Sequence, residues 1–209
     1  MAWIAPIVLT GPGVRLVPLS MVQHDELVEA VRDGELWKLW YTSIPAPEKM
    51  GAEIERRLEL QARGAMLPFA VLDSASGRAV GMTTYLNIDE ANRHLEIGAT
   101  WYRSSVQRTG LNTQCKLLLL TQAFEKFGCI AVDFRTHFFN RQSRRGIERL
   151  GAKLDGVLRN HMIGADGALR DTCVYSIIAG EWPTVKRHLQ AETDRKRAPI
   201  AGLSSPAVR

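Results

Sequence analysis

The sequence predicts one α/β domain, with a mixed and mostly antiparallel central sheet and helices on both of its faces. Two observations carry this prediction. Apolar residues first recur with helical spacing and then, between about residues 68 and 102, alternate with the period of strands. Farther along, a helix lies between two strands, a connection that brings strands together in parallel. The length of 209 residues allows one substantial core. We assign the single domain to residues 1–190.

Three elements are predicted before the first hairpin. Residues 14–19, "VRLVPL", alternate and predict a short edge strand, because a proline cannot donate to a strand ladder. Ser20 and Gln23 have the spacing of a capping box, which predicts a helix over 20–33. An aromatic and proline-rich stretch, "ELWKLWYTSIPAPEKM", leads into a second amphipathic helix over roughly 48–63.

A hairpin and a third strand follow. The segments "PFAVLD" and "AVGMTTYL" flank the turn "SASG" and predict two antiparallel strands. "RHLEIGATWY", residues 93–102, predicts the next strand. Regular alternation along it would place two sets of side chains on opposite faces, Leu95, Ile97, Ala99 and Trp101 on one and Glu96, Gly98, Thr100 and Tyr102 on the other.

A helix over 111–127 comes next, and Gly128 ends it. Its predicted buried stripe consists of Leu117, Leu120, Phe124 and Phe127. The strand over 129–137 would carry Ile130, Val132 and Phe134 on one side. Together these two elements complete the parallel strand–helix–strand unit.

The last elements are a short helix, a hairpin and a final helix. "NRQSRRGIERLG" predicts a helix that begins near Asn140 and is closed by Gly151. Strands over about 152–163 and 168–178 meet at the turn "GADG". "EWPTVKRHL" predicts the last helix, with a proline near its first turn.

The charge pattern argues against a nucleic-acid partner. The net charge is +5, but residues 194–209 contribute +3 of it. Nucleic-acid-binding proteins instead cluster basic residues on a folded face. Residues 191–209 are rich in Ala, Pro, Ser and Gly among basic residues, so we expect a disordered basic tail there.

Cysteine usage and hydropathy indicate a cytoplasmic protein. Cys115, Cys129 and Cys173 lie far apart in apolar surroundings, which favours free thiols in a reducing compartment. No Cys and His spacing predicts a metal site. The N-terminus lacks the basic leading region of a signal peptide, and no apolar run approaches the roughly 18 residues of a membrane span. We therefore expect no metal and no membrane partner.

The stretch "VQRTGLNTQCKLLLL" joins a polar, glycine-containing loop to a strongly apolar helix. The free N–H groups at the start of that helix, with Gly110 before them, would suit an anion such as a phosphate. A plainer interpretation is equally open at this point. Gly110 could simply turn the chain, and Thr109 or Asn112 could cap the helix.

Two motifs taken together favour the anion site. "QRTGLN" matches the acetyl-CoA signature Q/R-x-x-G-x-G/A, with Asn112 in the last small-residue position. "NRQSRRGIERLGA" follows one strand later. With these paired motifs, the chain from about 14 to 183 resembles the GNAT superfamily of acyl-CoA N-acyltransferases, most closely its RimJ/RimL-type branch. The resemblance implies the GNAT fold, with a gap between the parallel strands at 93–102 and 129–137.

The resemblance also implies a binding site for acetyl-CoA as co-substrate. The signature loop would hold the pyrophosphate, and strand backbone would hold the pantetheine arm together with Asn140. Arg144 or Arg145 could reach the adenosine phosphate, although at least one of them suits a solvated helix face. The implied CoA-binding residues are Thr100, Trp101, Gln107, Arg108, Thr109, Gly110, Leu111, Asn112, Thr113, Asn140, Ser143 and Arg145.

Acyl transfer to an amine needs a base for the amine, a donor for the carbonyl oxygen and a proton for the thiolate. Glu96 is the candidate base, since a carboxylate is uncommon in the middle of a strand; alternatively it pairs with Arg93, His94 or another strand cation. An N–H near Thr100 or Trp101 could stabilise the oxyanion. Many superfamily members carry a tyrosine four residues after the motif serine, but here Ile147 replaces it. Ser143, Tyr175 or water would then supply the proton.

The acceptor side is less defined by the sequence. Trp37, Trp40 and Tyr41 could line the acceptor site, or they could anchor a long loop to the sheet. The resemblance implies direct attack in a ternary complex by a primary amine, of a small molecule, a peptide or a protein N-terminus. The enzyme could form a homodimer. Alternatives are a non-catalytic acyl-CoA-binding sensor or scaffold, and a nucleic-acid binder that uses its basic tail.

Overall fold

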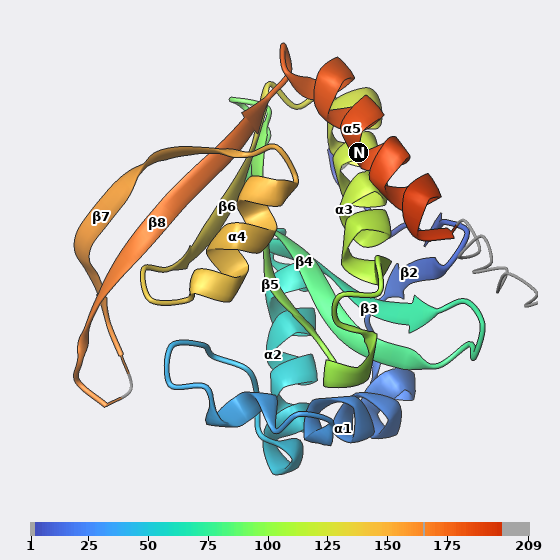
Figure 1. Cartoon of the computed structure of the whole chain (residues 1–209). Helices are drawn as coiled ribbons and strands as arrows, with labels where there is room; N and C mark the ends of the chain where they lie inside the picture. The colour runs from blue at the N-terminus through green and yellow to red at the C-terminus, as the bar shows by residue number, and fades with distance from the viewer. Residues whose placement is uncertain (1–2, 165, 198–209) are drawn as a thin grey trace, which may run out of the picture.

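The computed structural model describes residues 3–164 and 166–197 (Figure 1). Within these residues one sheet has the strand order β1-β2-β3-β4-β5-β6-β8-β7. All neighbours are antiparallel except β5 and β6, so the sheet is mixed as predicted. The strands are β1 (Leu9–Thr10), β2 (Val14–Pro18), β3 (Met66–Asp73), β4 (Ala79–Asp89), β5 (His94–Tyr102), β6 (Ala131–His137), β7 (Lys153–Ile163) and β8 (Leu169–Ile178).

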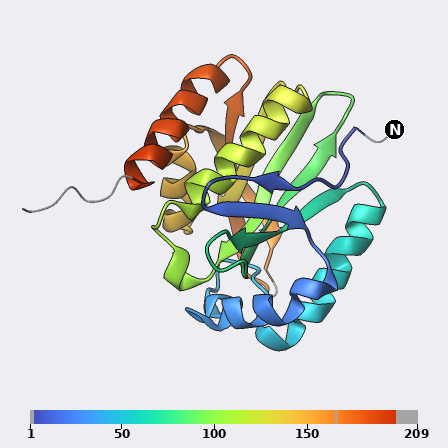
Figure 2. The ribbon, with the colours of Figure 1, turned by 90° about the vertical axis from the view of Figure 1, so that its right-hand side faces the viewer.

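Helices cover both faces of this sheet (Figures 1 and 2). The helices are α1 (His24–Arg32), α2 (Met50–Ala62), α3 (Leu111–Thr121), α4 (Arg141–Arg149) and α5 (Trp182–Arg197). α1 and α2 pack on one face, and α3, α4 and α5 pack on the other. α3 and α5 lie side by side in both views. No helix in the described part of the chain is long and apolar enough to cross a membrane.

Each face of the sheet has its own core. On the α3 face Tyr85 is fully buried, and its hydroxyl donates to the carbonyl of Leu119 at 2.6 Å. On the α2 face Met82 of β4 packs with Ile54 of α2. Met82 and Tyr85 are three positions apart in β4 and thus face opposite cores, as the strand period requires.

The parallel strands β5 and β6 pair over a short distance only. In this register His94 pairs with Ala131, Leu95 with Val132 and Glu96 with Asp133. The two strands do not pair beyond Glu96. β5 nevertheless runs on to Tyr102 beside β4. The two strands therefore diverge and leave the predicted gap between them.

A β-bulge in β5 corrects the predicted alternation of that strand. Met82 pairs with Trp101 and Thr84 pairs with Gly98, so two residues of β5 lie opposite one of β4. Ala99 has a φ of +46° at this point. Beyond the bulge the faces are exchanged: Trp101 joins the α2 core, although regular alternation had placed it with Leu95 and Ile97. An extra residue shifts every later side chain to the other face.

Three boundaries differ from the prediction. β2 is not the edge, because β1 pairs along its first part, and Pro18 is its last residue. Ile130 lies before β6 and is exposed, so it does not share the face of Val132 and Phe134. α5 continues to Arg197, so residues 191–197 are helical, not part of a tail. The rest of the predicted tail, 198–209, lies outside the described residues.

The buried face of α3 is also rotated from the predicted stripe. Leu120 is fully buried, but Leu117, Phe124 and Phe127 are only partly buried. The buried positions of this segment are instead Leu111, Thr113, Cys115, Lys116, Leu119, Leu120 and Ala123. This face is wider than the stripe we predicted because α3 packs on the sheet, on α5 and on the N-terminal strands.

Candidate functional site

α3 begins with free backbone donors. Gly110 precedes it with a φ of +106° and a ψ of −12°, a conformation that suits glycine alone. Leu111 is buried and anchors the helix start. The N–H groups of Asn112 and Thr113 find no acceptor among the described residues, and the N–H of Gln114 is the first to bond back, to Gly110 at 3.1 Å. This geometry is suited to an anion.

The loop before α3 is held by its own side chains. The Gln107 Nε2 donates to the carbonyl of Tyr102 at 3.0 Å, and its Oε1 accepts from Gln142 Nε2 of α4 at 3.1 Å. The hydroxyl of Thr109 donates within the loop at 2.7 Å. Arg108 is exposed and has a φ of +65°. Two of the predicted residues therefore shape the loop, and Arg108 is left to meet a ligand.

The end of α5 contributes a residue that the sequence analysis missed. A Cβ at Gly110 would lie 2.9 Å from the Cδ of Lys196, so this side chain lies over the glycine. The sequence predicts a disordered tail at Lys196, and the structure corrects this prediction. The helical periodicity of "VKRHLQAETDRKR" could have extended the predicted helix. A cation so close to a helix start adds to the attraction for an anion.

The start of α4 lies beside the loop through the Gln107–Gln142 contact. Asn140 caps it, because its Oδ1 accepts the N–H of Ser143 at 3.0 Å. The Asn140 Nδ2 is left as a donor for a ligand. Arg144 is engaged, with its guanidinium 4.9 Å from the Phe138 ring centroid, whereas Arg145 is exposed. Of the two arginines, Arg145 is the one available to a phosphate.

Glu96 occupies the point where β5 and β6 part. It is 6% exposed, and its Oε2 accepts from Asn87 Nδ2 at 2.8 Å and lies 3.5 Å from Arg135 Nε. Its Oε1 would lie 2.8 Å from a Cβ added at Gly98, so the missing side chain of the glycine makes room for it. This oxygen accepts no hydrogen bond from the described residues. Burial raises the pKa of Glu96, although Arg135 and Asn87 act to lower it. One carboxylate oxygen is thus held and the other is free.

The structure does not bring Tyr175 to Glu96. Tyr175 is fully buried, its hydroxyl accepts from Arg144 Nε at 3.0 Å and it donates to Glu148 at 2.9 Å. It faces the core shared with α3 and α4, whereas Glu96 faces α2. Ile147 is buried in the same core. Because its hydroxyl is buried and already bonded to Arg144 and Glu148, Tyr175 is poorly placed as a proton donor, whereas Ser143 is only partly buried and is kept with water for that role.

An aromatic cluster lies on the loop between α1 and α2. Trp40 is 65% exposed, and its ring centroid lies 5.2 Å from that of His137, 5.5 Å from Tyr41 and 5.9 Å from Phe139. Trp37 packs against the α2 core instead. Trp40 and Tyr41 therefore extend toward the end of β6, and Trp37 anchors the loop.

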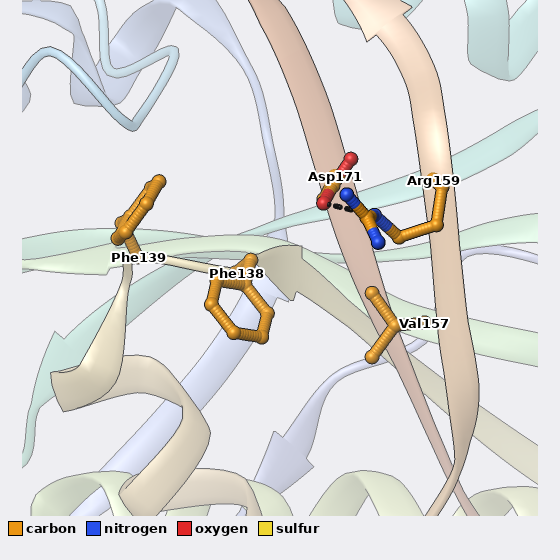
Figure 3. A pocket seen from close by; sticks show the side chains of 5 residues that line it. All are labelled: Phe138, Phe139, Val157, Arg159 and Asp171. Carbon is orange, nitrogen blue, oxygen red and sulfur yellow. Dashed lines mark hydrogen bonds and ion pairs between the residues drawn. The ribbon is translucent and has the colours of Figure 1, made fainter.

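A cavity of about 410 Å³ opens beyond the end of β6. Phe138, Phe139 and Val157 line it, together with Arg159 and Asp171, which form an ion pair at 2.6 Å (Figure 3). Phe139 also belongs to the aromatic cluster of Trp40. No sequence pattern predicts this cavity, because three separate segments form it.

Together, these features define a class of protein: an α/β fold whose two diverging parallel strands open beside a helix start with free N–H groups that suit an anion. The chain belongs to the GNAT acetyltransferase family, because residues 14–153 match the sequence model of the acetyltransferase (GNAT) domain.

Known relatives agree with this membership. YdaF of Bacillus subtilis (strain 168), whose name marks it as a candidate ribosomal N-acetyltransferase, is 31% identical over 106 residues. That match covers 51% of this chain and 57% of YdaF, so the chain spans little more than half of that relative.

Solved structures extend the likeness to nearly the whole fold. A GCN5-related N-acetyltransferase from Brucella melitensis is 29% identical with a TM-score of 0.81, covering 90% of this chain and 86% of that one. RimJ of Mycobacterium smegmatis, solved with CoA-disulfide, shares the fold at 23% identity and a TM-score of 0.74, covering 89% and 93%.

Proposed function

We propose that this protein transfers an acetyl group from acetyl-CoA to the nitrogen of a primary amine. The arrangement around β5 carries the proposal. Glu96 marks the end where the gap closes, and the loop before α3 follows the end where it is open. Six residues of strand separate the two, roughly 20 Å at 3.3 Å per residue. That length suits an extended ligand with a phosphate at one end.

The residues at this gap fit CoA. The free N–H groups at the start of α3 would bind its pyrophosphate, with Arg108, Arg145 and Lys196 as cations nearby. Backbone groups of Thr100 and Trp101 would bind the pantetheine arm. Asn140 would donate its Nδ2 to the same arm, since its Oδ1 already caps α4.

Acyl transfer from a thioester to an amine needs little from the protein beyond the positioning of both substrates. When bound, the thioester supplies an activated acyl group. Glu96 would take a proton from the acceptor ammonium with its free oxygen, directly or through water. The N–H of Thr100 or Trp101 would donate to the carbonyl oxygen. Ser143 or water would protonate the leaving thiolate.

The acceptor would approach on the α2 face, past the aromatic cluster of Trp40. We infer a small amine or a peptide amine, because aromatic rings can hold both an apolar chain and an ammonium group. The name of YdaF points to a protein acceptor, since it describes a ribosomal N-acetyltransferase. That description belongs to YdaF, and here it only adds peptides to the acceptors to test.

An acceptor screen tests this proposal. Acetyl-CoA would be incubated with amino acids, polyamines and N-terminal peptides, and released thiol would be measured. Acceptor-dependent release of CoA is the expected result. CoA binding without turnover of any amine would contradict the proposal and favour an acyl-CoA sensor.

Replacing Trp40 by alanine is expected to raise the KM for the acceptor about tenfold and to leave the KM for acetyl-CoA unchanged. The indole is 65% exposed and packs with the rings of the aromatic cluster, outside both cores, so its loss should remove acceptor contacts without opening the core. Steady-state kinetics with each substrate varied in turn measures both constants. Ile130→Ala, at an exposed apolar residue before β6, is the control. An unchanged acceptor KM would remove Trp40 from the site.

A further inference from the structure

Two buried cations that the proposed chemistry does not use lie on either side of the bulge in β5. Arg57 of α2 is 2% exposed and Lys116 of α3 is 5% exposed. They approach the sheet from opposite faces. A single charged residue inside "CKLLLL" is a signal that the sequence analysis passed over. Charged groups are rarely buried without a role for the charge.

From the α2 face, Arg57 binds the bulge directly. Both terminal nitrogens lie 3.4 Å from the carbonyl oxygen of Ala99. The same guanidinium donates to Thr84 Oγ1 at 2.8 Å and to Glu53 at 2.7 Å, so its own position is fixed. Ala99 has a positive φ at the bulge, and this contact helps to hold that backbone conformation.

From the α3 face, Lys116 binds the next residue. Its Nζ donates to Thr100 Oγ1 at 2.8 Å and to Thr83 Oγ1 at 3.2 Å, and the two hydroxyls are themselves 2.8 Å apart. Thr83 is the β4 residue opposite the bulge. Among the described residues no carboxylate pairs with this ammonium. Its bonds go only to the two strands at the bulge.

We propose that Arg57 and Lys116 are positioning residues that fix the peptide between Ala99 and Thr100. The N–H and C=O of a trans peptide point in opposite directions. The contact that fixes the Ala99 carbonyl therefore also fixes the direction of the Thr100 N–H. This N–H is a candidate donor to the acyl carbonyl, so the inference rests on the proposed function.

Lys116→Met tests the inference with little risk to the fold. It removes the ammonium, keeps the length of the side chain and leaves no carboxylate unpaired. We expect kcat to fall tenfold or more, while the KM for acetyl-CoA and the dissociation constant of CoA change less than twofold. The Tm should equal or exceed that of the wild type, since replacing a buried charge by an apolar residue is often neutral or stabilising.

A second readout does not depend on activity. Hydrogen exchange over residues 97–102 should be at least tenfold faster in Lys116→Met, because the bulge loses one of its supports. Lys126→Met, at an exposed lysine just beyond α3, is the matched control and should match the wild type throughout. Arg57→Lys, which keeps a charge but not the planar fork, should also lower kcat, because an ammonium cannot reproduce the contacts of the guanidinium with Glu53, Thr84 and Ala99.

The pH profile separates a charge effect from packing. Burial lowers the pKa of Lys116 to about 8. The titratable group that acts on this ammonium is Cys115, which is itself bonded to Tyr102, and burial raises the pKa of both, so they stay neutral near pH 8. As pH rises through 8 the ammonium loses its charge, and kcat should fall in the wild type. This limb should be absent in Lys116→Met.

Unchanged kcat and unchanged exchange in Lys116→Met would overturn the inference. So would a loss of kcat accompanied by an equal loss of CoA affinity and a lower Tm, since that marks a structural role. If the wild type turns over no acceptor, the proposed function fails, and the exchange measurement still decides whether Lys116 holds the bulge.

Discussion

Glu96→Gln is expected to lower turnover by roughly 10²–10⁴-fold, the range that a general base contributes. Glutamine keeps the shape of the side chain but cannot take a proton from the acceptor. The affinity for CoA should stay within twofold, because the loop before α3 is unaltered. Turnover with a saturating acceptor measures the first effect, and calorimetry with CoA measures the second.

Asp133→Asn is the matched control for this change. Asp133 is the partner of Glu96 across the parallel ladder and is also largely buried, but it pairs with His94 at 3.3 Å. Its loss should lower turnover far less. Equal turnover of Glu96→Gln and wild type would remove Glu96 as base, and a greater loss in Asp133→Asn would transfer the role to Asp133.

The pH dependence provides a further check on Glu96. Its pKa is raised by burial, so the carboxylate becomes protonated at a higher pH than an ordinary glutamate. A base must be deprotonated to act. The acid limb of kcat/KM should therefore lie above pH 4.5, with activity lost as pH falls through the raised pKa. An unchanged acid limb of kcat/KM in Glu96→Gln would contradict the assignment of Glu96 as the base.

Gly110→Ala is expected to weaken CoA binding about tenfold or more. At a φ of +106° an L-residue is strained by on the order of 1–3 kcal/mol, and the new Cβ would lie 2.9 Å from Lys196 Cδ. The lysine can move, but the strain is relieved only if the loop changes shape. The N–H groups at the start of α3 would then no longer converge on one anion.

Gly64→Ala controls for strain alone. Gly64 has a φ of +73° after α2, and a Cβ there would meet nothing within 4 Å. Both variants should lower the Tm by a few degrees, whereas only Gly110→Ala should weaken CoA binding in calorimetry. Equal CoA affinity in the two variants would show that the loop conformation at Gly110 does not matter for binding.

Most elements could be predicted because their signals are local. Ser20 and Gln23 form the expected capping box, at a 3-10 turn (Met21–Gln23) that leads directly into α1, with the Ser20 N–H donating to Gln23 Oε1 at 2.8 Å. Gly128, with a φ of +65°, ends the segment after α3 as expected. The end of α5 was misjudged because its composition resembles a tail, and its packing against α3 is a long-range contact.

The sequence by itself determined the residues that we propose for the donor end of the site. Gly110 and the spacing of Asn140 and Ser143 act through backbone conformation and capping within a few residues, so the starts of α3 and α4 can be predicted without the fold. The tertiary structure alone decided which groups support the reacting end. The bulge reverses the face of Trp101, and Arg57 reaches Ala99 across 42 positions of the chain. Such contacts depend on how separate elements pack together, and no local pattern specifies that.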